Sequence, residues 1–453
     1  MVATTHAPPI TSAPLPPVFP GLPVIGHTVE FVRNPVALLR RAQQSLGDVY
    51  RFRIVGQEFT VLAGPENHDA YFRAPETQLS AKEVYKFTVP IFGKGIAYDA
   101  EPQIMDEQLG FLYPALREDR LRTYIEKMEA ETRQYIARWG AEGQLDLHVS
   151  LNELTTYIAS RTLVAEEIRH TASAEFAAAY HDLQAGINAI GFFAPHAPVP
   201  SNLRRDRARR EIVKLLEKVL ADRRRSGRRE EDFMQTLLES RYKDGKALTD
   251  HEIVGLLVTA LFAGQHTSAV LATWVGIELM RHRHVLPPIL AELERLYGEG
   301  QEITFDRLKQ STTLERAINE TERMHPPLIM LVRKVLKDME IGGYLLPAGT
   351  LAMVSPALSH HLWRVFRSPE SFDPERFAPP REESKKHAYT LIAFGGGKHR
   401  CVGLHFAYLQ IKAIWSVLLR EYDFELVTKE PQADYASWVV GPKAPCLVRY
   451  RRR

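Results

Sequence analysis

A long uncharged segment, Ile253 to Ile277, most strongly limits the folds open to this 453-residue chain. It contains no Asp, Glu, Lys or Arg, and its length would suit a membrane-spanning helix. Its centre, however, carries Gln265, His266, Thr267 and Ser268, which would be costly in lipid. A helix that crosses a protein interior beside a bound group could use these side chains. We therefore predict a buried core helix in a soluble protein.

The composition sets the size of the core. Hydrophobic residues make up 45% of the chain and charged residues 25%, as in an ordinary globular protein. The length alone would allow two or three domains, but we find no internal repeat and no Gly/Ser-rich or charged linker. We predict a proline-rich N-terminal segment over residues 1–24, laid along the surface, followed by a single domain over residues 25–453.

The start of the chain and its cysteines indicate a compartment. Met1 to His6 lacks the charged and apolar regions of a signal peptide. Only two cysteines occur, so a disulfide framework is implausible and a reducing compartment is expected. The second, Cys446, lies in a short alternating segment and is predicted to be a structural strand residue. We expect a cytoplasmic protein without a transmembrane anchor.

The charge pattern does not favour a nucleic-acid partner. The formal net charge is only +3. The main basic cluster runs from Arg204 to Arg229, but Ile212, Leu215, Leu216 and Val219 recur inside it at helical spacing. This pattern predicts a helix with a solvated basic face. An acidic redox protein could still dock on some basic surface.

Helical periodicity dominates elsewhere. Two short strand signals, residues 49–54 and 59–62, flank residues 55–58 as a predicted hairpin. We therefore predict a mainly α protein with a small β region. The clearest amphipathic stripe repeats at three- and four-residue steps through Leu121, Tyr124, Ile125, Met128, Thr132, Tyr135, Ile136 and Trp139.

The first cysteine, Cys401, stands in a glycine-rich loop. The residues before it are Phe394-Gly395-Gly396-Gly397-Lys398-His399-Arg400. Glycines let the backbone turn tightly and direct N–H groups at the sulfur, and the basic residues supply positive charge. A buried cysteine acting as a small hydrophobe is the alternative, but it would not need these neighbours. The loop is typical of a thiolate presented to haem iron, with the bases available to its propionates.

The spacing F-x-x-G-x-x-x-C-x-G resembles the haem-binding signature of the cytochrome P450 superfamily. Two further patterns follow that superfamily's order. Glu320 and Arg323 share one helical face and can pair, and Pro326-Pro327 should end their helix. A later turn, Phe372 to Phe377, carries Arg376. The resemblance implies that Glu320, Arg323 and Arg376 are structural residues that support the haem loop.

The centre of the uncharged helix, Ala263 to Ser268, resembles the superfamily's oxygen-activating motif. The resemblance implies a widened helix in which Thr267 faces bound dioxygen and takes part in a proton relay. His266 replaces the usual acid, and an imidazole titrates near neutrality. The alternative is a core histidine satisfied by a carbonyl group. We expect Thr267 and His266 to be the catalytic residues.

Two segments narrow the resemblance to the sterol 14α-demethylase branch. One is Gly264-Gln265-His266-Thr267-Ser268. The other is Tyr85 to Asp99, which departs from the branch's pattern at Ile96, where valine is usual. The resemblance covers most of the chain, and it implies a P450 fold with haem b buried between the oxygen-activating helix and the cysteine loop.

The resemblance also implies the residues of the site. Cys401 would be the axial ligand of the haem iron, Tyr85, Arg333 and His399 would meet the propionates, and Phe394 and Gly395 would also bind the cofactor. A stretch from Gly186 to Pro200, with Phe192 and Phe193, is either a lid or an ordinary exposed loop. The sterol cavity, which suits an apolar substrate, would be lined by Tyr85, Phe87, Phe92, Phe262, Ala263, Leu328 and Ile329.

The implied reaction is removal of a sterol 14α-methyl group by three successive O2-dependent oxidations. Formate would be released and a C14–C15 double bond left. No flavin or iron–sulfur motif occurs, so a ferredoxin-type donor and its reductase, separate or fused, would supply electrons. The alternatives are a P450 hydroxylase of another lipid or terpenoid, a haem-binding sensor without catalysis, and a helical protein without haem.

Two departures from the branch bear on the site. Ala269 stands where a second serine is common, so a hydrogen bond from the helix is missing. A basic residue that contacts a propionate is common after Tyr98-Asp99, but residues 105–110 offer none. We expect haem binding to depend more on Arg333 and His399.

Overall fold

The computed structural model describes residues 13–171, 173–186, 191–192 and 194–453. Its contacts divide the chain into two compact units. We call Met1–Val84, Ile329–Pro369 and Ser384–Arg400 the sheet unit, and Tyr85–Leu328, Glu370–Glu383 and Cys401–Arg453 the helical unit. The single domain over residues 25–453 stays a prediction.

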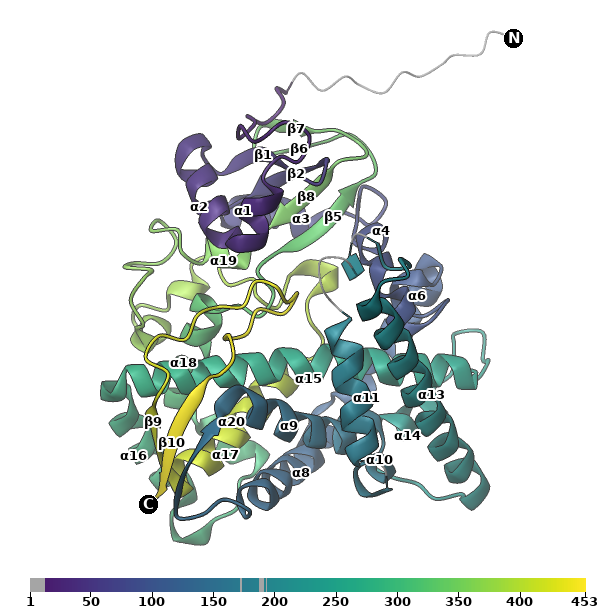
Figure 1. Ribbon diagram of the computed structural model, residues 1–453, viewed down its shortest axis with the longest axis vertical. Coiled ribbons are helices and arrows are strands. Elements are labelled where there is room, and N and C mark those ends of the chain that lie inside the picture. Colours follow the sequence, from purple (N-terminus) through teal and green to yellow (C-terminus); the bar gives the residue numbers. More distant parts are fainter. Residues whose placement is uncertain (1–12, 172, 187–190, 193) are drawn as a thin grey trace. The chain divides into compact units, whose positions relative to one another are not determined.

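The sheet unit is built on one five-stranded sheet of order β1-β2-β8-β5-β3 (Figure 1). The β2–β8 pair is parallel, and the other neighbours are antiparallel. Its elements are β1 (Val49–Ile54), β2 (Gln57–Leu62), β3 (Leu79–Ser80), β5 (Leu331–Val335), β6 (Met339–Ile341), β7 (Tyr344–Leu346), β8 (Leu351–Val354), α1 (Thr28–Arg33), α2 (Pro35–Leu46), α3 (Pro65–Arg73), α19 (Pro356–Ser359) and η8 (Gly397–His399).

The N-terminal segment lies along this unit, as far as it is described. The backbone N–H of Arg51 in β1 donates to the Pro17 carbonyl at 2.8 Å, and Phe19 N–H donates to the Arg51 carbonyl at 2.7 Å. Residues 1–12 lie outside the described residues. The expectation of a stretch laid along the surface therefore holds for the described part.

The β1–β2 hairpin is tighter than predicted. Its turn consists of Val55 and Gly56 alone, both at positive φ (48° and 75°), and Ile54 pairs with Gln57. Two-residue turns with positive φ at both positions match the twist of antiparallel strands. Gln57 and Glu58 therefore belong to β2, and the four-residue turn over 55–58 was wrong.

The helical unit holds most of the helices and a three-stranded sheet of order β4-β10-β9. Its helices are α5 (Val89–Phe92), α6 (Pro102–Gly110), α7 (Leu112–Ala115), α8 (Glu118–Ile136), α9 (Leu147–Ala159), α10 (Glu166–Thr171), α11 (Ser173–Ala185), α13 (Pro200–Ser226), α14 (Phe233–Glu239), α15 (Asp250–Arg281), α16 (Leu286–Tyr297), α17 (Phe305–Gln310), α18 (Thr312–Met324) and α20 (Leu404–Glu421). Its strands are β4 (Glu142–Asp146), β9 (Tyr422–Leu426) and β10 (Leu447–Arg452).

Short helical turns complete the chain. They are η1 (Lys86–Thr88), η2 (Ala97–Asp99), the π-helix η3 (Ser160–Val164), η4 (Arg283–Val285), η5 (Gly298–Gly300), η6 (Pro374–Phe377), and two elements at unit boundaries, α4 (Lys82–Tyr85) and η7 (Glu383–Lys385).

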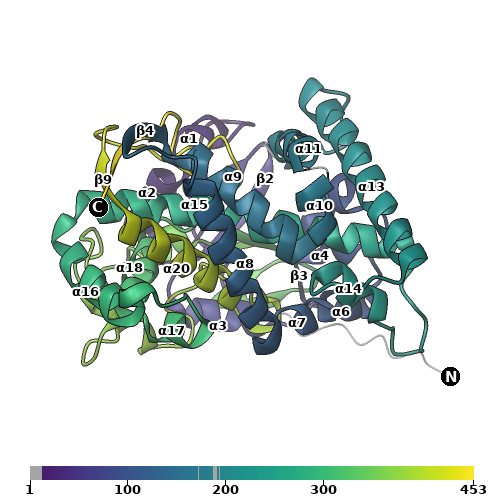
Figure 2. The same ribbon diagram turned by 90° about the horizontal axis from the view of Figure 1, so that it is seen from below.

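The uncharged segment forms the middle of α15, the core helix of the helical unit. Thr249 caps its N-terminus in a capping box with Glu252. Helices α9, α18 and α20 pack against α15 (Figure 2). Two stretches among the described residues, α15 and residues 397–421, are long and apolar enough to cross a membrane, but 72% and 67% of their most apolar windows are buried. The predicted core helix is confirmed.

Three other helix predictions are confirmed wholly or in part. The predicted stripe is buried on α8 from Leu121 to Ile136, but its last member, Trp139, lies beyond the end of the helix and is partly buried. Helix α13 buries Ile212, Leu216 and Val219 as predicted, but Leu215 is only partly buried, and the basic face is not wholly solvated because Arg205 and Arg223 are buried. Helix α18 ends at Met324, before the double proline. Among the strand predictions, Cys446 is fully buried directly before β10, and burial raises the pKa of its thiol to about 12.

Candidate functional site

Close packing on Phe72 of α3 and positive φ angles explain the three glycines before the cysteine. Gly395 and Gly397 have positive φ (70° and 60°). A Cβ on Gly397 would lie 2.3 Å from the carbonyl oxygen of Phe72, and a Cβ on Gly396 would lie 2.6 Å from the Tyr389 ring. Any other residue would force this backbone away from α3.

The cysteine itself belongs to the helical unit. Cys401 is exposed, and Gly403 caps the N-terminus of α20. The partial positive charge of a helix N-terminus favours a thiolate. Helix α20 packs on α8 and α15, and the Trp415 indole donates to the Ala272 carbonyl of α15 at 2.9 Å. Helix α20, which begins three residues after Cys401, is thereby fixed to the helix that carries Thr267.

The middle of α15 keeps accessible surface on a helix that is otherwise buried. Ala263 is exposed, and Gly264, His266 and Thr267 are partly exposed. Thr267 Oγ1 donates to the Ala263 carbonyl at 2.8 Å. The helix is uninterrupted at this point, so the expected widening is not seen. Thr267 satisfies its hydroxyl within the helix instead.

One ring nitrogen of His266 is buried, although the residue keeps some accessible surface. Its Nδ1 atom is inaccessible and has no hydrogen-bond partner among the described residues. Burial, with a smaller effect of the charge on His148, lowers the pKa of His266 to about 4. Titration near neutrality is therefore wrong for this imidazole, which is neutral at pH 7. The alternative, a core histidine whose ring is hydrogen-bonded to a carbonyl group, is not seen at Nδ1 either.

The residues that follow His266 are buried as well. Ser268 Oγ has no hydrogen-bond partner in the described part of the chain, and Ala269 is fully buried.

An aromatic cluster brings together three distant parts of the helical unit. The rings of Phe87 and Phe192 lie 5.0 Å apart, and Trp438 lies 5.3 Å from Phe87 and 4.9 Å from Phe192. Phe87 was predicted to line the substrate cavity, and Phe192 to belong either to a lid or to an ordinary exposed loop. Trp438 was missed, because no periodic or motif signal surrounds it. Phe193 lies outside the described residues.

The other predicted substrate residues fall into separate groups. Tyr85 stacks on Tyr98 at 4.9 Å, and Phe92 meets Phe262 edge to face at 5.7 Å. Leu328 packs on the core of the helical unit, and Ile329 is buried in the sheet unit.

The two predicted propionate contacts of the sheet unit are held in place by α3 and the residues that follow it. Arg333 is 4% exposed, donates from Nη1 to the Tyr71 carbonyl at 2.9 Å and lies 4.6 Å from the Tyr71 ring centre. His399 Nε2 lies 3.0 Å from Glu76 Oε2. Both side chains therefore already have a protein partner that fixes their position.

Glu76 is a partly buried anion in this arrangement. Burial alone would raise its pKa, but hydrogen bonds from His399, the Ser80 hydroxyl and the Lys82 N–H outweigh it and lower the pKa from 4.5 to about 2. The carboxylate oxygen Oε1 accepts from Ser80 at 2.6 Å and from Lys82 at 3.0 Å.

Replacing Glu76 by glutamine should lower the free energy of unfolding by about 1–3 kcal/mol at neutral pH, since charge-assisted hydrogen bonds are lost. Because the folded pKa lies below the ordinary value, this stabilisation is complete above pH 4.5 and is lost as the pH falls toward 2. Urea unfolding over a pH series measures it. The exposed Glu66 of α3, replaced by glutamine, is the control. If the difference in free energy of unfolding between wild type and E76Q stays constant as the pH falls, the lowered pKa of Glu76 is wrong.

The predicted charge network is present and fully buried. Arg323 donates from Nε to Glu320 Oε2 at 2.7 Å and from Nη2 to Oε1 at 2.9 Å. Arg376 donates from Nε to Glu320 Oε1 at 2.9 Å and from Nη1 to Glu383 Oε2 at 3.0 Å. Glu320, Arg323 and Arg376 are each 0% exposed. The network joins α18 to the turn η6, and its support of the haem loop stays a prediction.

Residues 105–110, which contain no basic residue, include the buried amide side chain of Gln108. Gln108 of α6 accepts from the Ala97 N–H at 2.7 Å and donates to the Gly95 carbonyl at 3.0 Å. Gln108 therefore holds the loop before Tyr98, where Ala97 has a φ of 48°. A cation is absent from 105–110, as the sequence indicated.

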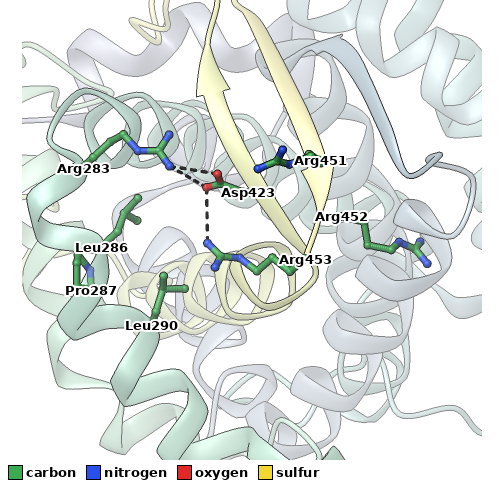
Figure 3. Close-up of a pocket in the computed structure, with 8 residues that line it drawn as sticks. All are labelled: Arg283, Leu286, Pro287, Leu290, Asp423, Arg451, Arg452 and Arg453. Carbon is green, nitrogen blue, oxygen red and sulfur yellow. Dashed lines mark hydrogen bonds and ion pairs between the residues drawn. The ribbon is translucent and has the colours of Figure 1, made fainter.

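A separate cavity of about 420 Å³ lies in the helical unit, away from these residues (Figure 3). Arg283 contacts both oxygens of Asp423, at 3.0 and 3.2 Å, and Arg453 lies 3.6 Å from this carboxylate. No predicted site residue lines the cavity.

Three relatives that align with nearly the whole chain are named for the same activity. The chain is 41% identical to a sterol 14-demethylase of Arabidopsis thaliana, over 97% of this chain and 92% of that protein. It is 38% identical to a sterol 14alpha-demethylase of Mycolicibacterium vanbaalenii, covering 94% and 96%, and 38% identical to the lanosterol 14-alpha demethylase of Bos taurus, covering 99% and 90%. A cyanobacterial P450 solved with retinoic acid bound matches with a TM-score of 0.88 at 24% identity, over 98% of this chain and 100% of that one, which bears on the fold.

Fold and loop chemistry together define a mainly α haem-thiolate protein. The family model described as "Cytochrome P450" matches residues 16–448. The chain belongs to the cytochrome P450 family, and the predicted fold is confirmed. Its cofactor is haem ligated by a cysteine thiolate, with O2 as co-substrate.

The residues of the site fit a haem group. Cys401 supplies a soft sulfur donor, and the glycine backbone before it lies where no Cβ could fit. On α15, Ala263 is exposed and the neighbouring His266 and Thr267 keep some accessible surface, so this face of the helix is partly polar. A planar apolar group with a polar edge suits such a combination.

Proposed function

We propose that this protein is a sterol 14α-demethylase, which removes the 14α-methyl group of a lanosterol-like sterol by three O2-dependent oxidations. The methyl group leaves as formate, and a C14–C15 double bond remains. The observation that carries the proposal is similarity of 38–41% over at least 94% of the chain to relatives of that name from a plant, a bacterium and a mammal. The histidine-threonine motif of α15 supports it.

The side chains would divide the work as follows. Cys401 would hold the haem iron, and the bound haem would supply dioxygen activation. Tyr85, Arg333 and His399 would hold the propionates. Thr267 would deliver protons at the accessible side of α15, and neutral His266 would pass them between its two ring nitrogens.

The apolar residues would orient the sterol. Phe87, Phe192 and Trp438 would cover its flat hydrocarbon body and exclude water. Phe92, Phe262, Ala263, Leu328 and Ile329 would line the remaining wall.

We also propose that the two units form one haem-binding domain over residues 25–453, with haem buried between α15 and the cysteine loop. The family model, which runs through every boundary between the units, supports this. Electrons would come from a ferredoxin-type donor and its reductase, separate or fused, in the cytoplasm. Two cysteines, one of them the proposed haem ligand, cannot ligate an iron–sulfur cluster, which supports an external donor.

An optical titration tests the substrate class. Purified ferric protein should show a saturable low-spin to high-spin Soret shift with lanosterol and related 14-methyl sterols, and none with fatty acids. Trp438→Ala should weaken sterol binding by roughly tenfold or more, because it removes a large apolar contact. Trp363→Ala, at an 82% exposed tryptophan, is the matched control. A shift with fatty acids but not with sterols would exclude demethylation and favour a hydroxylase of other lipids.

A further inference from the structure

Two buried histidines hold the segment that leads into the cysteine loop. His68 of α3 and His360, directly after α19, are both 0% exposed. His68 Nδ1 lies 3.0 Å from the Tyr389 carbonyl oxygen. The Ile392 N–H donates to His360 Nε2 at 2.9 Å. All four residues belong to the sheet unit, so these contacts lie within one compact body.

The bonds around His68 have a fixed direction. A carbonyl oxygen only accepts, so Nδ1 must carry the proton and donate to Tyr389. The other ring nitrogen, Nε2, lies 3.0 Å from Ser359 Oγ. That hydroxyl is also 3.5 Å from the Gly64 N–H, which only donates. Ser359 Oγ therefore accepts from Gly64, and its own hydroxyl can donate to Nε2 when the imidazole is neutral.

The charge state of His68 agrees with this direction. Burial lowers the pKa of His68 to about 4, against smaller raising effects of the Tyr389 carbonyl and Glu66, while His387 and Arg364 lower it further. The ring is therefore neutral at pH 7, with one donor and one acceptor.

His360 has the complementary role. Its Nε2 accepts from a backbone N–H, so this nitrogen must carry a lone pair. The Ile392 N–H would otherwise be a buried donor without a partner, which is costly. The next turn follows at once, because Gly395 N–H donates to the Ile392 carbonyl at 2.8 Å.

The aromatic packing depends on the same anchors. Tyr389 stacks on Phe72 of α3 at 5.2 Å, and Gly396 and Gly397 pack against these two residues. A shift of Tyr389 would therefore move the surface on which the cysteine loop is folded.

We propose that His68 and His360 are positioning residues for the haem-binding loop, which fix Tyr389 and Ile392 and so set the path of the backbone into Phe394 and Cys401. The inference rests on the haem-thiolate assignment and not on the sterol substrate. It predicts that changes at these two positions alter how firmly haem and its thiolate bond are held.

Four variants of the holoenzyme test the proposal. His360→Leu removes the acceptor for Ile392, whereas His360→Gln can place its amide oxygen near the position of Nε2. His68→Leu removes the donor to Tyr389, whereas His68→Asn can place an amide N–H near the position of Nδ1. His361→Leu, in the same turn, is the control, because its Nδ1 lies 3.1 Å from the Ala357 carbonyl of α19.

The readouts are the rate of haem transfer to apomyoglobin and the Soret band of the ferrous–carbon monoxide complex, which reports the thiolate bond. We expect both leucine variants to lose haem roughly tenfold faster, the order of effect of one unsatisfied buried group, and to lose part of the thiolate-ligated signal. The glutamine and asparagine variants should recover most of both, and H361L should match wild type.

Two results would overturn the proposal. One is leucine variants that unfold at lower temperature but keep the wild-type rate of haem loss and thiolate signal. The other is amide variants as defective as the leucine variants. If a leucine variant cannot be purified with haem, His360→Asn, too short to reach Ile392, is compared with H360Q in the same assays. A missing sterol shift in a protein with a normal thiolate signal would refute the proposed function and leave this inference intact.

Discussion

Replacing Glu320 by alanine is expected to lower the free energy of unfolding by about 3–5 kcal/mol, because one partner of a buried ion network is removed. The carboxylate receives hydrogen bonds from Arg323, from Arg376 and from the Asp373 N–H at 2.9 Å. All three charged side chains are 0% exposed, so water cannot replace it. The loss is a large fraction of the stability of an ordinary domain.

An exposed ion pair between the same two elements provides the matched control. Arg316 of α18 and Glu375 of η6 lie 3.2 Å apart, with side chains 28% and 63% exposed. Glu375→Ala should cost less than about 1 kcal/mol, since exposed pairs contribute little. Guanidinium unfolding, followed by far-UV circular dichroism and by the haem absorbance, measures both variants. Equal losses for E320A and E375A would show that burial of the network does not matter.

Local periodicity explains which elements could be predicted. The stripe of α8 and the Glu320–Arg323 pair depend on residues three or four positions apart, whereas α15 was predicted from an unbroken run without charged residues. Such contacts form within one helix, so spacing in the sequence is sufficient to find them. The end of α18 could be predicted for the same reason, since proline acts on its immediate neighbours.

Contacts between distant segments could not be derived in this way. Arg376 was assigned to the Glu320 network only through the family resemblance. Trp438 joins the Phe87–Phe192 cluster from a part of the chain without a periodic pattern. His68 and His360 had no sequence signal, because what makes each important is a backbone group of residues 389–392.

Burial also shifts the pKa of a side chain away from the value that its residue type suggests. The ordinary pKa of an imidazole is near 6.5, but burial in the helical unit lowers the pKa of His266 to about 4. A sequence gives the kind of group, whereas desolvation is a property of everything folded around it. The proposed relay must therefore start from a neutral ring.

Replacing Thr267 by alanine should reduce sterol product by roughly 10²-fold or more, the usual contribution of a positioned proton donor. Dioxygen and reductant should still be consumed, with hydrogen peroxide as the main product, because haem binding does not involve this hydroxyl. Thr267→Ser keeps a hydroxyl that can donate to the Ala263 carbonyl, as Thr267 does at 2.8 Å. It should retain most of the coupling between reductant and product.

The same helix offers a control that separates proton delivery from helix packing. Thr259 Oγ1 donates to the Gly255 carbonyl at 2.8 Å, the same four-residue bond, from a buried part of α15. Thr259→Ala should keep the ratio of product to reductant close to wild type, whatever it does to stability. Formate, peroxide and reductant are counted in one reconstituted reaction. If T259A uncouples reductant consumption from product formation as strongly as T267A, the Thr267 hydroxyl acts by packing the helix and not by delivering protons. If T267A stays fully coupled, Thr267 is not the proton donor, and the accessible face of α15 must receive protons by another route.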